Sequence, residues 1–232
     1  MQNDKDLAQL ERIALLEQAA QAADTNDETR KLREIPTEKC NTLVPNKAQK
    51  RPYLDLMLDL ETLGTKPGSV ILSIGAAPFG SHVANAPTFY TSIGMHDSQA
   101  RGLKVDPKTL AWWQQQELPV KAAAFMGANP LIEALAKFTG YIKFLESLGF
   151  EVRVWGNSAS FDCGILKAAY EAIGQEAPWK YYNEMCFRTL KNLVPASLTP
   201  RRQGMAHHAL DDAIYQARWA EGLFKFLNLS WG

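Results

Sequence analysis

The chain has 232 residues, 46% of them hydrophobic, which is enough for one folded domain with a substantial core and argues against wholesale disorder. Lysine plus arginine numbers 25 and aspartate plus glutamate also 25, so the formal net charge is zero. A protein that coats duplex nucleic acid along many phosphates usually has a basic excess. Any contact with nucleic acid is therefore expected to be local, such as one strand end.

The three cysteines show no CxxC spacing, which argues against a zinc site and a disulfide framework: Cys40, Cys163 and Cys186. The sequence shows neither a signal-peptide pattern at its start nor a run approaching the ~20 apolar residues of a membrane span. We therefore expect a soluble cytoplasmic protein with no membrane contact.

The first fifty residues differ from the rest, so the chain is divided into a region at 1–50 and a main domain at 51–232. Residues 6–23 are rich in Ala, Leu, Glu and Gln at helical spacing, which predicts an amphipathic helix. Residues 24–53 are polar and contain three prolines, which predicts a linker. The helix has three open roles: docking on its own domain, binding a partner, or fraying.

The main domain opens with three predicted strands. The apolar run at 54–60 is followed by a Lys-Pro-Gly turn signal and a buried run at 70–76, and 88–93 resembles a third strand. An antiparallel meander is the expected arrangement.

Helices interleaved with one short strand follow this meander. Asp106 as N-cap with a proline after it predicts a helix over 107–116. Further helices are predicted at 130–148, 161–173 and 210–227, and a strand at 152–155. This order indicates an α/β or α+β layered domain.

Asp59 and Glu61 stand one residue apart at the end of the first predicted strand. Residues two apart on a strand point to the same side, so the two carboxylates repel each other unless a cation lies between them. Mg²⁺, with Mn²⁺ as its substitute, is the cation that takes only oxygen ligands. Taken alone, the pair is more often an ordinary polar strand face, and the rest of the sequence decides.

Two further segments supply the missing groups. Asp162 follows a short strand and a polar turn, in the first turn of a helix, where an acid by itself is usually a cap. His207 precedes Asp212 by five positions at the start of the last helix, after a basic loop at 195–205. Two roles are open for Arg201 and Arg202 in this loop, contact with phosphates or solvated surface charge. A loop histidine ahead of a helical acid suits a general base beside a metal ligand.

Together these segments resemble the DEDDh group of 3′-to-5′ exonucleases. The group's Asp-x-Glu motif matches Asp59 and Glu61, its polar turn before Phe-Asp matches 157–162, and its third motif matches His207 and Asp212. The resemblance covers residues 54–227 and rests on the joint occurrence of the motifs. A Trp-Trp pair and a Phe-Arg-Thr-Leu segment look closest to the phage and prophage branch, which includes exodeoxyribonucleases and bacterial exoribonucleases.

The resemblance implies an RNase H-like fold, a mixed central β-sheet flanked by helices, here with an N-terminal helical extension. It implies metal-dependent hydrolysis of phosphodiester bonds at the 3′ end of single-stranded nucleic acid, releasing nucleoside 5′-monophosphates. The phage-like features favour DNA, with RNA as the alternative and an inactive binding module as a third hypothesis. Homodimers occur in some branches of the group, and that question stays open.

The resemblance also implies the role of each residue. Two Mg²⁺ ions would be held, with Asp59 touching both, Glu61 and Asp212 completing the first site and Asp162 the second. His207 would take a proton from the attacking water near neutral pH. The family spacing places it ahead of His208, a rival base, and selects Asp212 over Asp211, which lies ~100° away around the helix.

Substrate contacts are expected from two walls of the site, with one leucine wedged against a base: Thr62, Leu63 and Gly64 on one side, Asn157 and Phe161 on the other. Trp112 and Trp113 are adjacent in a helix, so one is expected in the core while the other is available to stack on a base. At Cys186 and Phe187 many relatives carry an acid. The first fifty residues have no counterpart in the motifs.

Overall fold

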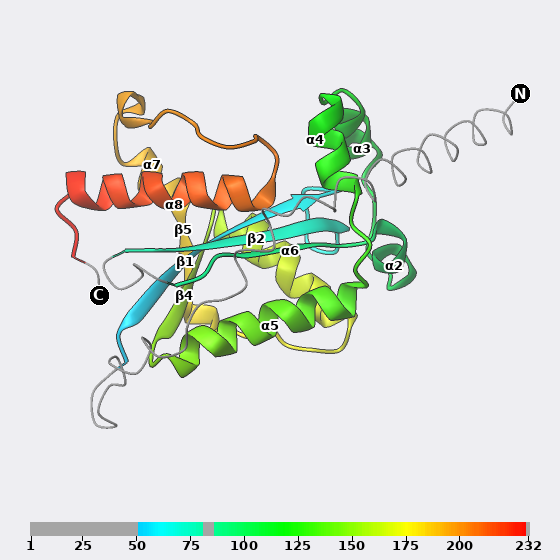
Figure 1. Cartoon of the computed structure of the whole chain (residues 1–232), viewed down its shortest axis with the longest axis horizontal. Helices are drawn as coiled ribbons and strands as arrows, with labels where there is room; N and C mark the ends of the chain where they lie inside the picture. Colours follow the sequence, from blue (N-terminus) through cyan, green and yellow to red (C-terminus); the bar gives the residue numbers. More distant parts are fainter. Residues whose placement is uncertain (1–50, 81–85, 231–232) are drawn as a thin grey trace, which may run out of the picture. The chain divides into compact units, whose positions relative to one another are not determined.

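The computed structural model describes residues 51–80 and 86–230. The predicted helix at 6–23, nearly all of the predicted linker and Cys40 lie outside these residues. Five strands form one sheet in the order β3-β2-β1-β4-β5 (Figure 1). Their bounds are β1 Tyr53–Thr62, β2 Ile71–Phe79, β3 Phe89–Ser92, β4 Glu151–Gly156 and β5 Glu184–Cys186.

The sheet is mixed, as the resemblance implies. Strands β1, β2 and β3 pair antiparallel and form the predicted meander, while β4 pairs parallel with both β1 and β5. The ladder between β1 and β2 shifts register between Glu61 and Thr62. Such irregularities bend a strand and re-aim its side chains, and this one lies at the end of β1 that carries the acids.

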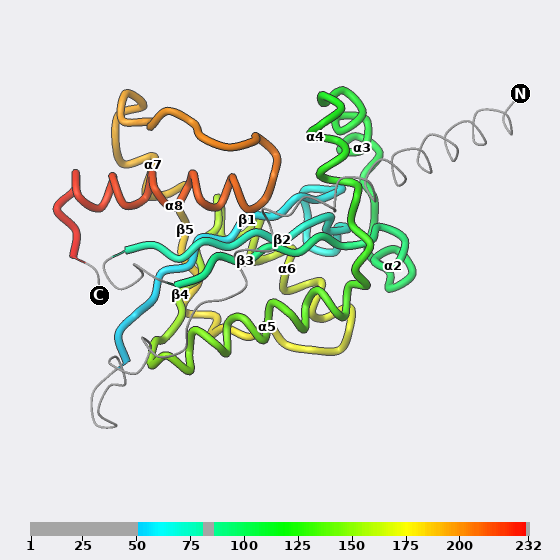
Figure 2. The backbone as a smooth tube through the Cα atoms, viewed as in Figure 1, coloured from blue at the N-terminus to red at the C-terminus, as the bar shows by residue number. Residues whose placement is uncertain are grey.

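Helices cover both faces of the sheet (Figures 1 and 2). Helices α5 and α6 pack on one face, α7 and α8 lie on the other, and α2, α3 and α4 gather at one end. Their bounds are α2 Met95–Ala100, α3 Pro107–Gln114, α4 Leu118–Phe125, α5 Leu131–Ser147, α6 Ala159–Ala172, α7 Phe187–Asn192 and α8 Ala209–Phe226. The long helices α5, α6 and α8 and the capped helix α3 match the predicted ranges within a few residues.

Among the strands and α-helices of the described residues, four were not predicted: α2, α4, β5 and α7. Each spans eight residues or fewer, and β5 only three. Segments this short do not complete enough turns or alternations to show a periodicity, so their structure depends on neighbours that pack against them.

Alternation along β1 separates the two faces. Leu54, Leu56, Leu58 and Leu60 are buried in the core beneath α5 and α6. Met57 belongs to a second core with residues of α7 and α8. Burying one leucine side chain contributes roughly 1.5–3 kcal/mol, so this face of β1 fixes the register of the strand. The acids between the leucines consequently face α8.

Gly75 allows α8 to approach the sheet closely. It pairs with Asp59 in the β1–β2 ladder, and a Cβ at this position would lie 2.2 Å from the carbonyl carbon of Ala209 at the start of α8. Only glycine leaves room for such a contact between a strand and a helix backbone. The first turn of α8, with Asp212, therefore lies directly over the end of β1 that carries Asp59.

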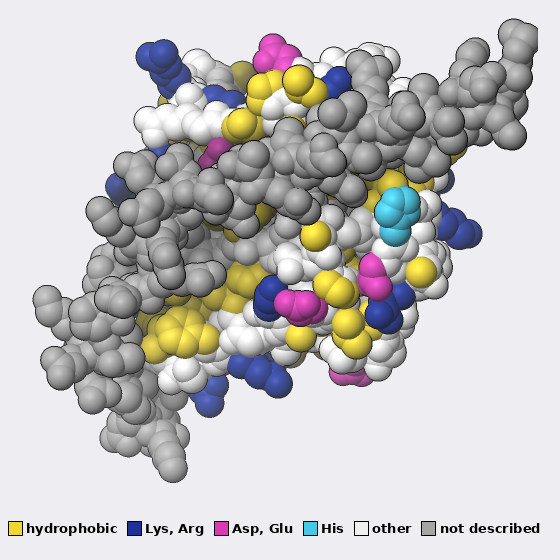
Figure 3. Space-filling model, turned by 45° about the vertical axis from the view of Figure 1, so that its right-hand side comes forward, with side chains coloured by type: hydrophobic (Ala, Val, Ile, Leu, Met, Phe, Trp, Pro, Cys, Tyr) yellow, Lys and Arg dark blue, Asp and Glu magenta, His cyan; other side chains and the backbone are white. Residues whose placement is uncertain are grey.

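Charges of both signs are interspersed over the described part of the surface in Figure 3 rather than gathered by sign. This pattern agrees with the zero net charge. Within residues 51–80 and 86–230, no helix combines the length and the apolar character needed to cross a membrane.

Candidate active site

Three acids line the face of β1 that points toward α8, and their surroundings differ. The Asp55 carboxylate accepts hydrogen bonds from Arg153 at 2.7 and 2.6 Å and from the Trp155 indole at 2.6 Å. Asp59 accepts one from Gln216 Nε2 at 2.7 Å. Oε1 of Glu61 is buried and has no hydrogen-bond partner among the described residues. The protein itself neutralises Asp55, whereas Asp59 and Glu61 lack a countercharge of that kind.

Helix α8 adds a third carboxylate to this pair. One oxygen each of Asp59, Glu61 and Asp212 lie within 4.8 Å of one another, and we call these three residues the carboxylate cluster. The other partners of Asp212 come from the preceding loop. The backbone N–H of His207 donates to its Oδ2 at 2.9 Å, and Arg202 forms an ion pair with its Oδ1.

Asp162 lies beside the cluster, at the start of α6. Its side chain is buried, with 2% exposed, and its Oδ2 accepts a hydrogen bond from the backbone N–H of Asn157 at 2.7 Å. The carboxylate therefore ties the turn after β4 to α6, while the N-cap position of this helix is Ser158. Its charge also reaches the cluster, because it raises the pKa of both Asp59 and Glu61.

The pKa values of Asp59, Glu61 and Asp162 are raised. Burial, followed by the charge of Asp162, raises the pKa of Glu61 from 4.5 to about 8. Burial raises the pKa of Asp162 to about 7 against the lowering effect of backbone hydrogen bonds, and that of Asp59 well above its usual range. Acids gathered in a low-dielectric site hold protons near neutral pH unless a cation replaces them.

The donor set and the geometry fit a hard divalent cation. All three ligand atoms of the cluster are carboxylate oxygens, one carboxylate has a buried oxygen without a partner, and a fourth acid lies alongside. Mg²⁺ and Mn²⁺ prefer such oxygen ligands, whereas structural zinc sites use cysteine and histidine. A cation would relieve the repulsion that raises the pKa of Glu61.

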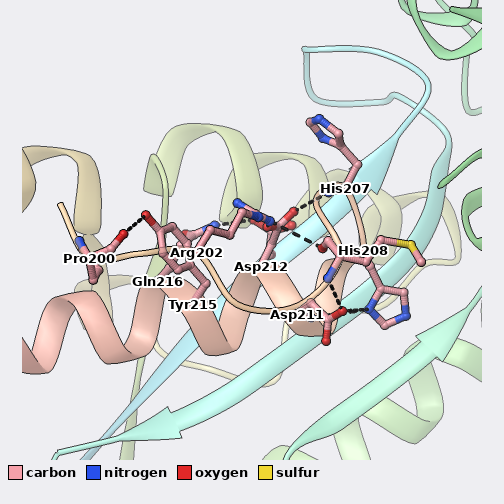
Figure 4. A network of polar contacts seen from close by, with 10 residues as sticks. Pro200, Arg202, His207, His208, Asp211, Asp212, Tyr215 and Gln216 are labelled. Carbon is pink, nitrogen blue, oxygen red and sulfur yellow. Dashed lines mark hydrogen bonds and ion pairs between the residues drawn. The ribbon is translucent and has the colours of Figure 1, made fainter. Parts of the chain in front are cut away.

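His207 stands at the edge of the cluster, with its ring turned away from α8 (Figure 4). Its φ of 61° lies in the left-handed region, which lets its N–H meet Asp212 while its side chain points outward. The ring packs edge-on against Trp112, with the two ring centres 4.9 Å apart. Burial, and then the charge of Arg202, lower its pKa below 6.5, so the imidazole is neutral near pH 7 and able to accept a proton.

His208 and Asp211 point elsewhere (Figure 4). His208 is the N-cap of α8, where its Nδ1 accepts a hydrogen bond from the Asp211 N–H at 3.4 Å, and its ring stacks on Tyr90 at 4.7 Å. Asp211 accepts a hydrogen bond from the Met205 N–H at 2.8 Å. Both residues hold the loop and the helix start together, and neither contributes to the carboxylate cluster.

The two tryptophans of α3 have different environments. Trp113 is 2% exposed, and its indole donates to the Thr62 carbonyl at 2.9 Å, which ties α3 to the end of β1. Trp112 is 40% exposed and contacts the His207 ring. Trp113 is therefore the core residue of the pair, and Trp112 lies at the site.

Leu63 has a different position from the one expected of a base wedge. Its side chain is 0% exposed, and its backbone groups bond to Val70 and Asp106. Thr62 is buried as well, with its hydroxyl donating to the Gly64 carbonyl at 2.7 Å. This turn supports the end of β1 rather than presenting a side chain to a base.

On the opposite wall, Asn157 and Phe161 are half-buried. The Asn157 N–H donates a hydrogen bond to Asp162, and the Asn157 carbonyl accepts one from Arg188 at 2.7 Å. The side-chain Oδ1 of Asn157 is buried without a hydrogen-bond partner in the described chain. Asn157 thus has one polar atom left for a ligand beside Asp162.

Sequence reasoning missed Gln216, which holds Asp59. A signal was present, because Gln216 follows Asp212 by four positions and residues four apart share a helix face. It also missed the contact of Arg202 with Asp212, because the basic loop suggested phosphates or solvent, and not a carboxylate, as the partners of Arg201 and Arg202.

Comparisons with known proteins agree with this geometry. A family model described as the Rv2179c-like 3′-5′ exoribonuclease domain matches residues 54–224. A search of curated proteins gave no match.

Three solved structures are similar in fold. The first is the nuclease domain of 3′hExo, a DEDDh family member bound to rAMP. Its TM-score is 0.51 at 16% identity, and the match covers 78% of this chain and 95% of the 3′hExo chain. Cell-death related nuclease 4 (CRN-4) has a TM-score of 0.52 at 12% identity, covering 75% and 65%. A full-length 3′-exonuclease has a TM-score of 0.51 at 14% identity, covering 77% and 84%. At these identities the structures show the shared fold.

The family match spans most of the chain and includes every residue of the carboxylate cluster. The predicted mixed sheet flanked by helices is confirmed by the structure and its solved neighbours. The chain therefore belongs to the Rv2179c-like 3′-5′ exoribonuclease domain family and is a 3′-5′ exonuclease, a hydrolase that acts on nucleic acid.

Proposed function

We propose that this protein is a metal-dependent 3′-5′ exoribonuclease that removes nucleotides singly from the 3′ end of single-stranded RNA. The carboxylate cluster is the observation that carries the proposal, because its oxygens converge within 4.8 Å without a countercharge to match them all. The description of the family supports RNA, and the related fold of 3′hExo was solved with a ribonucleotide. The preference for DNA that the phage-like motifs suggested has no support in the comparisons.

Four acids would hold the metals. Asp59 would contact both ions, Glu61 and Asp212 would complete one site, and Asp162 would serve the other. When bound, two Mg²⁺ or Mn²⁺ ions supply Lewis-acid stabilisation of the charge that develops on the phosphate and lower the pKa of the attacking water.

His207 serves as the general base in this proposal. Its neutral imidazole takes a proton from water as the water oxygen attacks the phosphorus of the 3′-terminal nucleotide. The bond from that phosphorus to the 3′ oxygen of the preceding nucleotide breaks, and the departing oxygen takes up a proton from solvent. The products are a nucleoside 5′-monophosphate and a strand one nucleotide shorter with a free 3′ hydroxyl. Because its ring now packs on Trp112, His207 has to turn toward the cluster when substrate binds.

The test uses matched single-stranded RNA and DNA oligonucleotides labelled at the 5′ end. With Mg²⁺ or Mn²⁺ we expect the RNA to shorten stepwise from its 3′ end, faster than the DNA. Chelator and Asp212→Ala should each stop the reaction. Intact RNA under every metal condition would refute the exonuclease, and faster cleavage of DNA would refute only the preference for RNA.

A further inference from the structure

A cationic side chain stands at the carboxylate cluster. Arg202 lies in the loop at 200–207, which we call the Arg202 loop, and its guanidinium pairs with Asp212 while lying 5.0 Å from the centre of the Tyr215 ring (Figure 4). Its side chain keeps 37% of its surface exposed. One protein cation therefore already partly neutralises the site at which the divalent cations are proposed to bind.

The backbone of the Arg202 loop is pinned along α8. The Pro200 carbonyl accepts a hydrogen bond from the Tyr215 hydroxyl at 3.1 Å. The N–H groups of Met205 and His207 donate to Asp211 at 2.8 Å and to Asp212 at 2.9 Å. A side-chain bond from Arg218 to Gln203 lies between these backbone contacts. These anchors hold the chain on both sides of Arg202. The guanidinium, by contrast, ends a long side chain with many rotamers, so it is able to move while the loop stays in place.

A guanidinium and a divalent cation compete for the same carboxylate oxygens. A divalent cation held by Asp212 would repel the guanidinium from that carboxylate, because the two charges have the same sign. The Tyr215 ring keeps Arg202 near the site, because a cation over an aromatic face is attracted to it. The next anion to reach this position is the phosphate of the substrate. A guanidinium matches it with two parallel N–H donors.

We propose that Arg202 is a substrate-phosphate-binding residue, held at Asp212 in the metal-free enzyme and released to the phosphate when metal binds. This inference rests on the proposed function, since it places the phosphate at the metal site. It adds a residue outside the four acids and the histidine to the substrate contacts.

Arg201 provides a matched control. It has the same charge and stands one position away, but it lines a separate pocket of about 380 Å³ with Pro200, Gln203, Tyr215 and Arg218. A purely general effect of loop charge would act through either arginine, whereas the proposed contact depends on Arg202.

The first measurement is a Mn²⁺ titration by calorimetry on the full chain, without substrate. Because Arg202→Gln removes the competing cation, we expect it to bind Mn²⁺ about three- to fivefold more tightly than wild type. This fold-change corresponds to the free energy of a partly exposed ion pair. Arg201→Gln should bind Mn²⁺ as wild type does. Equal affinities in the two variants would contradict the competition, and thermal denaturation checks that each is folded.

The second measurement uses AMP and adenosine as probes at saturating Mn²⁺. Arg202→Gln should weaken AMP binding about tenfold or more, as expected for a lost charged hydrogen bond, and leave adenosine unchanged. Arg202→Lys keeps the positive charge but lacks the two parallel N–H donors, so its affinity for AMP should lie between those of wild type and Arg202→Gln. The phosphate role is refuted if AMP binds Arg202→Gln as it does wild type, or if wild type does not bind AMP. A wild-type protein that binds Mn²⁺ and AMP but cleaves no RNA refutes the proposed function instead.

Discussion

At the scale of single residues, surroundings decide what an acid on β1 does. The Asp55 carboxylate accepts two hydrogen bonds from Arg153 and one from the Trp155 indole, so its charge is neutralised within a structural ion pair. Asp59 and Glu61 lie on the same face of the strand as Asp55. Asp59 accepts a hydrogen bond from a glutamine, and one oxygen of Glu61 has no hydrogen-bond partner among the described residues. Acids on the same face of one strand thus form one internal salt bridge and one site that suits an external cation.

Asp59→Asn should abolish turnover and leave the fold intact. Asparagine keeps the size and the contact with Gln216 through its amide oxygen, but it removes the charge proposed to contact both ions. Several kcal/mol of lost transition-state stabilisation corresponds to about a thousandfold or more in kcat. RNA-cleavage rates and circular dichroism are the measurements. Cleavage within tenfold of wild type would remove Asp59 from the centre of the mechanism.

The two adjacent histidines should separate into one catalytic and one structural effect. His207→Ala is expected to lower kcat by about 10²–10⁴ with little change in stability, as for a lost general base. His208→Ala removes the N-cap of α8 and should cost about 0.5–2 kcal/mol of stability while retaining most activity. Steady-state rates and urea unfolding of both variants test this. The reverse pattern would make His208 the base.

At the scale of elements, the site depends on how closely α8 approaches the sheet. β1 supplies two acids at its end, the β4–α6 turn supplies Asp162, and α8 supplies Asp212 together with Gln216. These elements are far apart in sequence, and the alternation of leucines along β1 decides which face the acids take. The missing side chain at Gly75 then decides whether α8 can lie close enough for Asp212 to join them.

Gly75→Ala should therefore disrupt the cluster from outside it. The added methyl would lie 2.2 Å from backbone atoms of α8, so the helix has to shift, at a cost of about 1–3 kcal/mol or more. We expect weaker Mn²⁺ binding and a lower Tm. Gly140→Ala is the control, because Gly140 lies in α5 with no atom within 4 Å of the added Cβ, and alanine there should stabilise the helix. Unchanged Mn²⁺ affinity in Gly75→Ala would contradict the close-approach argument.

At the scale of the whole molecule, the buried acids couple metal binding to stability. The chain has no net charge and both signs are interspersed on the described part of the face in Figure 3, so this local concentration of negative charge is not offset by a net basic charge. Folding without metal requires that these carboxyls either bury their charge or take up protons.

The metal-free protein should lose stability as pH rises from about 5 to 8. Glu61 has a pKa near 4.5 when unfolded and about 8 when folded, so between these values the folded state binds the additional proton and its stability falls with rising pH. Asp162, with a folded pKa of about 7, acts in the same direction. Tm measured in chelator across this range checks the slope. Mg²⁺ at pH 8 should raise Tm, Glu61→Gln should flatten the dependence, and a Tm that rises with pH in chelator would contradict the argument.

The sequence by itself determined the long elements and the motif residues. Strand β1, helices α5, α6 and α8 and the N-cap at Asp106 follow from local periodicity and side-chain chemistry, which act between residues close in the chain. The short elements α2, α4, β5 and α7 do not, because contacts with distant segments stabilise them.

Only the tertiary structure decided which of several equivalent residues reaches the site. It gave Trp112 and Trp113 different environments, and likewise His207 and His208. It also buried Leu63 and paired Arg202 with Asp212. Each of these outcomes depends on packing between segments that are distant in the chain, as the contact between α8 and β2 at Gly75 shows for Asp212. A spacing along the chain has no information about such distances.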